Sequence, residues 1–102
     1  MYSVVVSAQA DDDLDAILAY FVGKLGNREA AIRFVDAVDG VYDNLARYPM
    51  MYGLSFDGRL AEKGYRSVVI ENHIMLYKVD EDHRRVLVAR FFYGKRDYGK
   101  YL

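Results

Sequence analysis

Apolar residues in the first half of the chain recur every three or four positions, in two separate stretches. This spacing predicts two amphipathic helices. Ser7 is a suitable N-cap for the first helix, which ends at Gly26; Asn27 is a suitable N-cap for the second, which Pro49 closes. Because the turn between them is short, the helices form an antiparallel hairpin. The apolar positions are Leu14, Ile17, Leu18, Phe21, Val22 and Leu25 in the first helix and Ala31, Phe34, Val35, Val38, Val41, Tyr42 and Leu45 in the second.

Four short stretches rich in β-branched and aromatic residues predict strands, at residues 2–6, 65–70, 73–79 and 86–93. Glu71 and Asn72 suit a tight hairpin turn, and residues 80–84 form the next turn. Residues 50–64 are interpreted as a polar loop. The element order is then β-α-α-β-β-β. We predict an α+β fold of one domain, in which an N-terminal strand joins a three-stranded antiparallel meander and the helical hairpin covers one face.

The last strand has apolar residues on both faces, which is typical of a strand in the middle of a sheet. Arg90 is the exception, and we expect it to pair with Glu71 or another acid. Tyr77, on the neighbouring strand, is expected in the core. After Gly94 comes a basic, tyrosine-rich segment, residues 95–101, which suits a phosphate-facing site but is more simply a solvated basic end. The three aspartates at 11–13 are interpreted as a solvated helix start rather than a metal site.

Composition excludes several classes of function. The 102 residues include no cysteine, so disulfides, zinc–cysteine sites and thiol chemistry are ruled out and a cytoplasmic location is expected. No apolar run reaches membrane-spanning length, and no signal peptide is expected. No cofactor or metal site is expected either. Residues 1–50 carry a net charge of −4 and residues 51–102 carry +3, so any contact with a polyanion belongs to the second half.

Four pieces of the sequence, in this order and spacing, resemble the RelE/ParE superfamily of toxins from bacterial type II toxin–antitoxin systems. They are VVVSAQADDDLDAILAYF, AAIRFVDAVDGVYDNLARYP, GYRSVVIENHIMLYKVDED and VLVARFFYGKRDY. In this superfamily, RelE-like members cut mRNA in the ribosomal A site without a metal, and ParE-like members inhibit DNA gyrase without being nucleases. The resemblance therefore implies a cognate antitoxin as partner, and gyrase or the ribosome with its mRNA as target. A higher-order toxin–antitoxin complex is left open.

The resemblance also implies candidate catalytic residues, should the chain be a nuclease. Arg66 lies where RelE-like toxins place a basic residue on the sheet, and Arg96 matches the C-terminal catalytic arginine. Tyr98 or Tyr101 is near the position of the terminal tyrosine, and His73 could serve as acid or base, although a histidine at a strand start is more simply exposed. Further candidate contacts with target or antitoxin are Arg90, Lys95 and Lys100.

Two departures from the RelE pattern favour the ParE branch. Val68 stands where RelE-like toxins have a lysine, and Ile74 and Met75 stand where they have an arginine. The long helical hairpin is also more similar to ParE. The first hypothesis is therefore a gyrase inhibitor. The second is a ribosome-dependent endoribonuclease, and the third is a non-toxic module that binds antitoxin.

Overall fold

The computed structural model describes residues 1–94 of the chain. Its elements follow the predicted order, with two additions, a π-helix and a short third α-helix. In chain order the elements are β1 (Ser3–Val6), α1 (Ala8–Ala19), the π-helix η1 (Tyr20–Lys24), α2 (Arg28–Arg47), α3 (Gly58–Glu62), β2 (Arg66–Ile70), β3 (His73–Asp80) and β4 (Arg85–Tyr93).

The four strands form one sheet in the order β1-β4-β3-β2. Strands β2, β3 and β4 make the predicted antiparallel meander, and β1 pairs with β4 in the parallel direction. Strand β4 therefore lies inside the sheet, as its two apolar faces predict. The register shifts between Leu76, opposite Arg90, and Tyr77, opposite Val88. Ala89 is the extra residue, so β4 carries a β-bulge at this point.

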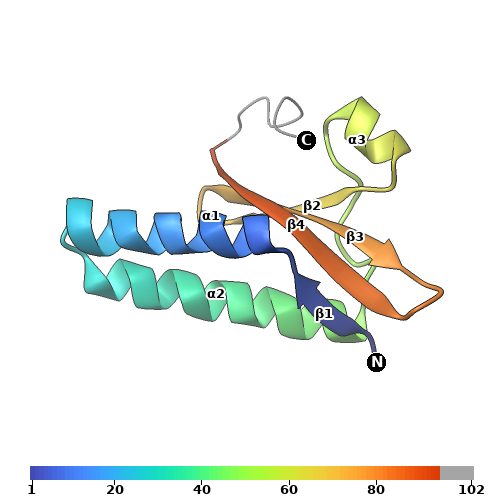
Figure 1. The fold of residues 1–102 in the computed structure, drawn as a ribbon, viewed down its shortest axis with the longest axis horizontal. Helices are drawn as coiled ribbons and strands as arrows, with labels where there is room; N and C mark the ends of the chain where they lie inside the picture. Colours follow the sequence, from blue (N-terminus) through green and yellow to red (C-terminus); the bar gives the residue numbers. More distant parts are fainter. Residues whose placement is uncertain (95–102) are drawn as a thin grey trace.

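The helical hairpin covers one face of the sheet and α3 covers part of the other (Figure 1). Tyr77 is fully buried between the hairpin and the sheet, as predicted. On the opposite face, which we call the outer face, Leu60 of α3 packs over a smaller apolar cluster. The residues that β2–β4 give to the hairpin side are Val68, Ile70, Met75, Tyr77, Val86, Val88 and Phe91, and those given to the outer face are Ile74, Leu76 and Phe92.

Both predicted helix caps are present. The Ser7 hydroxyl accepts a hydrogen bond from the Ala10 amide at 3.0 Å, and the Asn27 side chain accepts one from the Ala30 amide at 3.0 Å. Gly26 has a φ of +59°, a left-handed conformation that ends the first helix. The apolar stripe of that helix is not buried to its end, because Val22 and Leu25 are about half exposed.

The interpretation of residues 50–64 as an unbroken loop was wrong, because α3 forms within it. The Asp57 carboxylate caps this helix by accepting from the Arg59 and Leu60 amides at 3.0 and 3.1 Å. Upstream, Leu54 bridges to Arg66 and so covers the first half of the β2 edge. A helix of five residues is too short for a periodic pattern to reveal.

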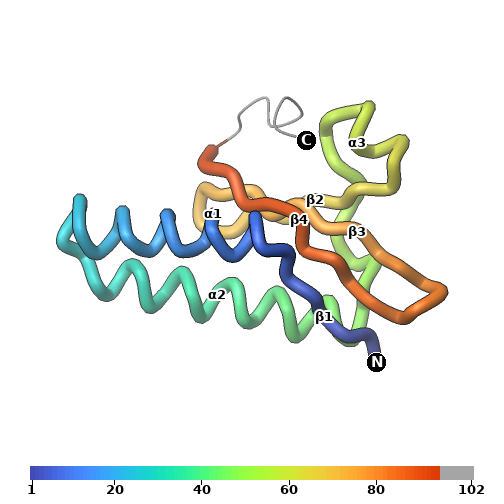
Figure 2. Tube along the Cα trace, viewed as in Figure 1, coloured from blue at the N-terminus to red at the C-terminus, as the bar shows by residue number. Residues whose placement is uncertain are grey.

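The predicted turn between β2 and β3 is confirmed. Glu71 and Asn72 both have positive φ, 43° and 69°, as a two-residue hairpin turn with the twist of the sheet requires. At the other end of the sheet, the Tyr2 amide donates to the Ala46 carbonyl at 2.8 Å, which holds the N-terminus beside the end of α2 (Figure 2).

Candidate functional site

Arg66, the candidate basic residue of the sheet, holds a loop in place. Its guanidinium donates to the Tyr52 carbonyl at 2.8 Å, and it lies near the phenol of Tyr77. Tyr77 in turn donates to the Pro49 carbonyl at 3.1 Å. Burial is the main reason why the pKa of Tyr77 is raised, and the Arg66 charge acts in the opposite direction. The guanidinium therefore lies on the hairpin side of the sheet and stabilises the segment that follows α2.

His73 is buried, with 6% of its surface exposed, so the expectation of an exposed histidine was wrong. Its ring lies among three aromatic rings, with centroids at 4.8 Å from Phe34, 5.3 Å from Tyr93 and 6.1 Å from Phe21. Its Nδ1 lies 3.0 Å from the Glu71 carbonyl oxygen. Phe21 of η1 and Phe34 of α2 pack against the first residue of β3, a tertiary contact that a sequence position at a strand start does not reveal.

The structure does not bring Arg66 and His73 together. Arg66 pairs with Tyr77, and His73 pairs with Ile70, at the opposite end of β2. The two pairs are four residue steps apart along the strand, a distance of about 13 Å. One general acid or base and one cation that act on the same phosphate must both reach it within hydrogen-bonding distance. Among the described residues, these two candidates do not form such an arrangement.

Arg90 is bound to Asp13, which confirms the expected pair with an acid but not with Glu71. Its Nε and Nη2 donate to the two carboxylate oxygens at 2.7 and 3.1 Å. This hydrogen bonding is the main cause of the raised pKa of Arg90. Asp13 also accepts from the Phe91 amide at 3.0 Å. Glu71 instead pairs with Arg33 of α2, at 3.0 Å.

Asp13 also corrects the view of residues 11–13 as a uniformly solvated run. Its side chain is 19% exposed. Strand β1 pairs with β4 only as far as Val88, and beyond that point α1 runs alongside β4. Asp13 satisfies an edge amide of β4 that β1 does not reach, and one carboxylate thus joins the first helix to the sheet.

The remaining candidates, Lys95, Arg96, Tyr98, Lys100 and Tyr101, lie outside the described residues. The last described residue, Gly94, has a φ of +67°, and its amide donates to the Asn72 carbonyl at 2.7 Å. The chain therefore leaves β4 beside the β2–β3 turn. We call this region, with His73, Tyr93, Gly94 and the turn at residues 71–72, the Tyr93 end of the sheet.

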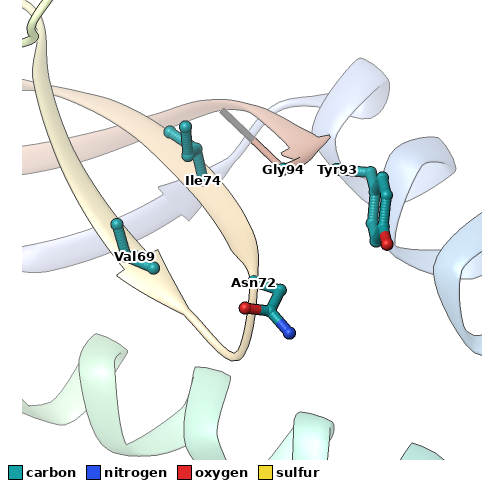
Figure 3. Close-up of a pocket in the computed structure, with 5 residues that line it drawn as sticks. All are labelled: Val69, Asn72, Ile74, Tyr93 and Gly94. Atoms are coloured by element: carbon teal, nitrogen blue, oxygen red, sulfur yellow. The ribbon is translucent and has the colours of Figure 1, made fainter. Parts of the chain in front are cut away.

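Two pockets adjoin the Tyr93 end and share Tyr93. One, of about 290 Å³, opens beside the β2–β3 turn and is lined by Val69, Asn72, Ile74, Tyr93 and Gly94 (Figure 3). The other, of about 390 Å³, lies against the first helix and is lined by Ala16, Ile17, Tyr20, His73 and Tyr93. Tyr93 is 65% exposed, unlike its neighbours Phe91 and Phe92. Tyr20 and Tyr93 were not among the sequence candidates; an aromatic residue next to the glycine that ends a strand was the only available signal.

Neither a metal site nor a membrane span is found in the described part of the chain. Residues 1–94 contain no group of three or more His, Asp or Glu side chains that could hold a metal ion. None of the helices described there has the length and apolarity that a membrane span requires.

Comparison with known protein families identifies the family of this chain. The model of the ParE toxin of type II toxin–antitoxin systems, parDE, matches residues 4–98. The chain belongs to the ParE toxin family. This membership confirms the RelE/ParE resemblance of the sequence and makes the protein a toxin of the type II class. No curated protein matches the toxin.

Three solved structures share the fold of the toxin. The chromosomal ParDE system of P. aeruginosa has a TM-score of 0.71 and 21% identity, covering 93% of this chain and 98% of that one. The YoeB/ParE toxin of Agrobacterium tumefaciens has a TM-score of 0.63 and 20% identity, covering 91% of this chain and 99% of that one. The RelBE2 toxin–antitoxin complex of Mycobacterium tuberculosis has a TM-score of 0.61 and 22% identity, covering 90% of this chain and 96% of that one. At these identities the likeness concerns the fold, which the ParE and RelE branches share.

Proposed function

We propose that this toxin arrests bacterial growth by inhibiting DNA gyrase and is not itself a nuclease. The observation that carries the proposal is the placement of Arg66 and His73. The Arg66 guanidinium is bound to the Tyr52 carbonyl, and His73 is buried among aromatic rings at the opposite end of β2.

Metal-independent cleavage of RNA needs a convergent set of groups. One group removes the proton of the 2′-hydroxyl, cations stabilise the charge of the transition state, and another group protonates the leaving oxygen. The positions where RelE-like toxins carry cations are occupied here by apolar residues, Val68 at one and Ile74 and Met75 at the other. Val68 and Met75 lie in the core beneath the helical hairpin, and Ile74 lies in the apolar cluster of the outer face. Arg90 has its charge matched by Asp13. Residues 1–94 thus supply little of a nuclease centre, and a stable fold that binds another protein needs none.

The test is a supercoiling assay with purified gyrase, relaxed plasmid and increasing amounts of toxin. We expect supercoiling to fall as toxin is added, and to recover when the cognate antitoxin is present in excess. An Arg66→Ala variant, compared at a temperature where it is folded, should inhibit as well as the wild type because Arg66 only supports a loop. Supercoiling that is unchanged at a large excess of toxin would refute gyrase as the target.

A ribosome-dependent endoribonuclease remains the second candidate, and the segment after β4 favours it. Arg96, Tyr98 and Tyr101 are residue types that such an enzyme uses, next to the basic residues Lys95 and Lys100. Primer extension on mRNA from programmed ribosomes tests this alternative. Cleavage by the wild type that is lost in Arg96→Ala would establish it, and the absence of any cut would exclude it.

We further propose a cognate antitoxin as the partner of this toxin. The similar structures from P. aeruginosa and M. tuberculosis are described as toxin–antitoxin systems or complexes. Two surfaces suit an antitoxin segment: the second half of the β2 edge, at Val69, and an apolar groove of about 300 Å³ between the two long helices. A complex that loses affinity when residues 95–102 are deleted would instead place part of the contact on the basic segment.

A third candidate is a non-toxic module retained for antitoxin binding. It predicts normal growth when the chain is induced without its antitoxin, whereas both toxin hypotheses predict arrest. Growth curves of induced and uninduced cultures separate these outcomes.

A further inference from the structure

The pocket between the first helix and the end of β4 is lined by two exposed tyrosines. These are Tyr20 and Tyr93, which are 52% and 65% exposed. Ala16 and Ile17, on the preceding turn of α1, line it as well. Its volume of about 390 Å³ falls in the range of sites that hold small molecules or single anchor side chains.

A π-helix begins at Tyr20, one of the residues that line this pocket. In η1 the Leu25 amide donates to the Tyr20 carbonyl at 3.0 Å, five residues back, so the turn is wider than an α-helical turn. The first two residues of η1 are aromatic and, as consecutive residues of a helix, they point in different directions. Phe21 packs against Phe34 and His73, and Tyr20 lines the pocket. Single π-turns inside helices are uncommon and recur at functional sites.

His73 also lines the pocket, and its ring carries two nitrogen atoms. A carbonyl oxygen only accepts hydrogen bonds, so the 3.0 Å contact with Glu71 requires the proton on Nδ1. In the neutral ring, Nε2 is then an acceptor. Within residues 1–94, Nε2 has no hydrogen-bond partner. The surrounding rings and the Glu71 contact fix the orientation of the imidazole, and hence the direction of this acceptor.

We infer that this pocket binds an aromatic side chain that carries one hydrogen-bond donor, a tryptophan or tyrosine of gyrase. Its ring would lie between Tyr20 and Tyr93, and its N–H or O–H would donate to Nε2 of His73. Tryptophan and tyrosine are the side chains that most often anchor protein interfaces, because they combine a large apolar surface with one polar group.

The choice of gyrase rests on the proposed function and on position. The pocket ends at Tyr93, one residue before Gly94 and the segment with Lys95 and Lys100, which are candidate contacts with target or antitoxin. The two surfaces that suit the antitoxin lie elsewhere, at the β2 edge and between the two long helices.

The first test uses small probes and does not depend on gyrase. Indole carries the N–H donor, and 1-methylindole has the same ring without it. Titration of the full-length toxin, followed by NMR shifts of backbone amides, should place indole beside Tyr20, His73 and Tyr93. We expect 1-methylindole to bind about tenfold more weakly, and a His73→Phe variant to bind the two probes alike. Equal binding of the probes by the wild type, or shifts elsewhere on the molecule, would overturn the inference.

The second test connects the pocket with the target. His73→Phe keeps an aromatic ring of similar shape, and His83→Phe is the matched control at an exposed histidine. We expect His73→Phe to need at least about tenfold more toxin for half-inhibition of gyrase, with unchanged antitoxin binding, and His83→Phe to match the wild type. If the wild type inhibits and His73→Phe inhibits equally, the anchor site is refuted although the proposed function stands. If the wild type does not inhibit gyrase, the proposed function fails and the assignment of the pocket to gyrase fails with it. The indole titration still decides whether the pocket binds an aromatic ring with a hydrogen-bond donor. Loss of antitoxin binding alone would assign the pocket to the antitoxin and overturn the gyrase assignment.

Discussion

The two ends of the β3–β4 hairpin each carry a histidine, in contrasting surroundings. At the tip, which we call the Asp80 end, Asp80 accepts from Arg85 at 2.9 Å and lies 3.0 Å from Nδ1 of His83. The His83 side chain is 68% exposed. At the Tyr93 end, His73 is buried among aromatic rings from η1, α2 and β4.

The contrast shows which end depends on the rest of the fold. Asp80, His83 and Arg85 lie within five residues of each other and satisfy one another across a turn. The Tyr93 end is assembled from segments that are far apart in sequence, through contacts such as Phe34–His73 and Asp13–Arg90. A change at the Asp80 end should therefore have local effects, and one at the Tyr93 end should affect the stability of the whole molecule.

The largest effect is expected from Asp13→Ala. The substitution leaves the Arg90 side chain, which is 20% exposed, without its carboxylate and the Phe91 amide without its acceptor. Removing one partner of a largely buried pair costs about 3 kcal/mol. Urea denaturation measures the loss, with Asp12→Ala as the matched control at the adjacent exposed aspartate. Equal stability of the two variants would show that the pair contributes nothing.

The two histidines give the next comparison. His73→Ala opens a cavity among Phe21, Phe34 and Tyr93 and should lower the free energy of unfolding by about 2 kcal/mol. His83→Ala should change it by less than about 0.5 kcal/mol, because that side chain is mostly in solvent. Thermal or urea unfolding of both variants tests the difference between the two ends. A His83 variant as unstable as the His73 variant would contradict it.

Tyr42 lies on α2, and its substitution should raise the free energy of unfolding rather than lower it. Its hydroxyl is buried without a hydrogen-bond partner among the described residues. Burial, with a smaller effect of Asp11 and Asp39, raises its pKa to about 12. We expect Tyr42→Phe to be neutral or to stabilise by up to about 1 kcal/mol. The ultraviolet titration of the wild type should include a late tyrosine near pH 12, which this variant lacks; a loss of stability would reveal a hidden partner.

The smallest effect concerns pH at the Asp80 end. Hydrogen bonding from Arg85 is the main reason why the pKa of Asp80 lies below its ordinary value of 3.8. The folded state therefore favours the ionised carboxylate. The stabilisation from this carboxylate is fully present above the pKa that Asp80 has in the unfolded chain. It is lost as pH falls through the lower pKa that Asp80 has in the folded protein. In the Asp80→Asn variant, the melting temperature should decline less steeply below about pH 4 than in the wild type. Plots of melting temperature against pH that stay parallel for the two proteins would disprove a contribution from Asp80.

The sequence predicted the elements that depend on local patterns. Ser7, Asn27 and the Glu71–Asn72 turn behave as their residue types suggest, and the two apolar faces of β4 correctly placed it inside the sheet. The missed features depend on tertiary contacts. The Asp13–Arg90 pair follows from α1 lying along β4 beyond the end of β1, and the burial of His73 follows from its contacts with Phe21 and Phe34. The π-turn that begins at Tyr20 has no signature in the spacing of apolar residues.

The central claim, that this toxin acts on DNA gyrase rather than on translation, is tested most directly by pulse labelling after induction. Cells that express the toxin without antitoxin receive short pulses of labelled thymidine and labelled methionine. A gyrase inhibitor stops the progress of replication first, so thymidine incorporation should fall while methionine incorporation is still near the uninduced rate. Methionine incorporation that falls at once, ahead of thymidine incorporation, would contradict the account and assign the toxin to the ribosome.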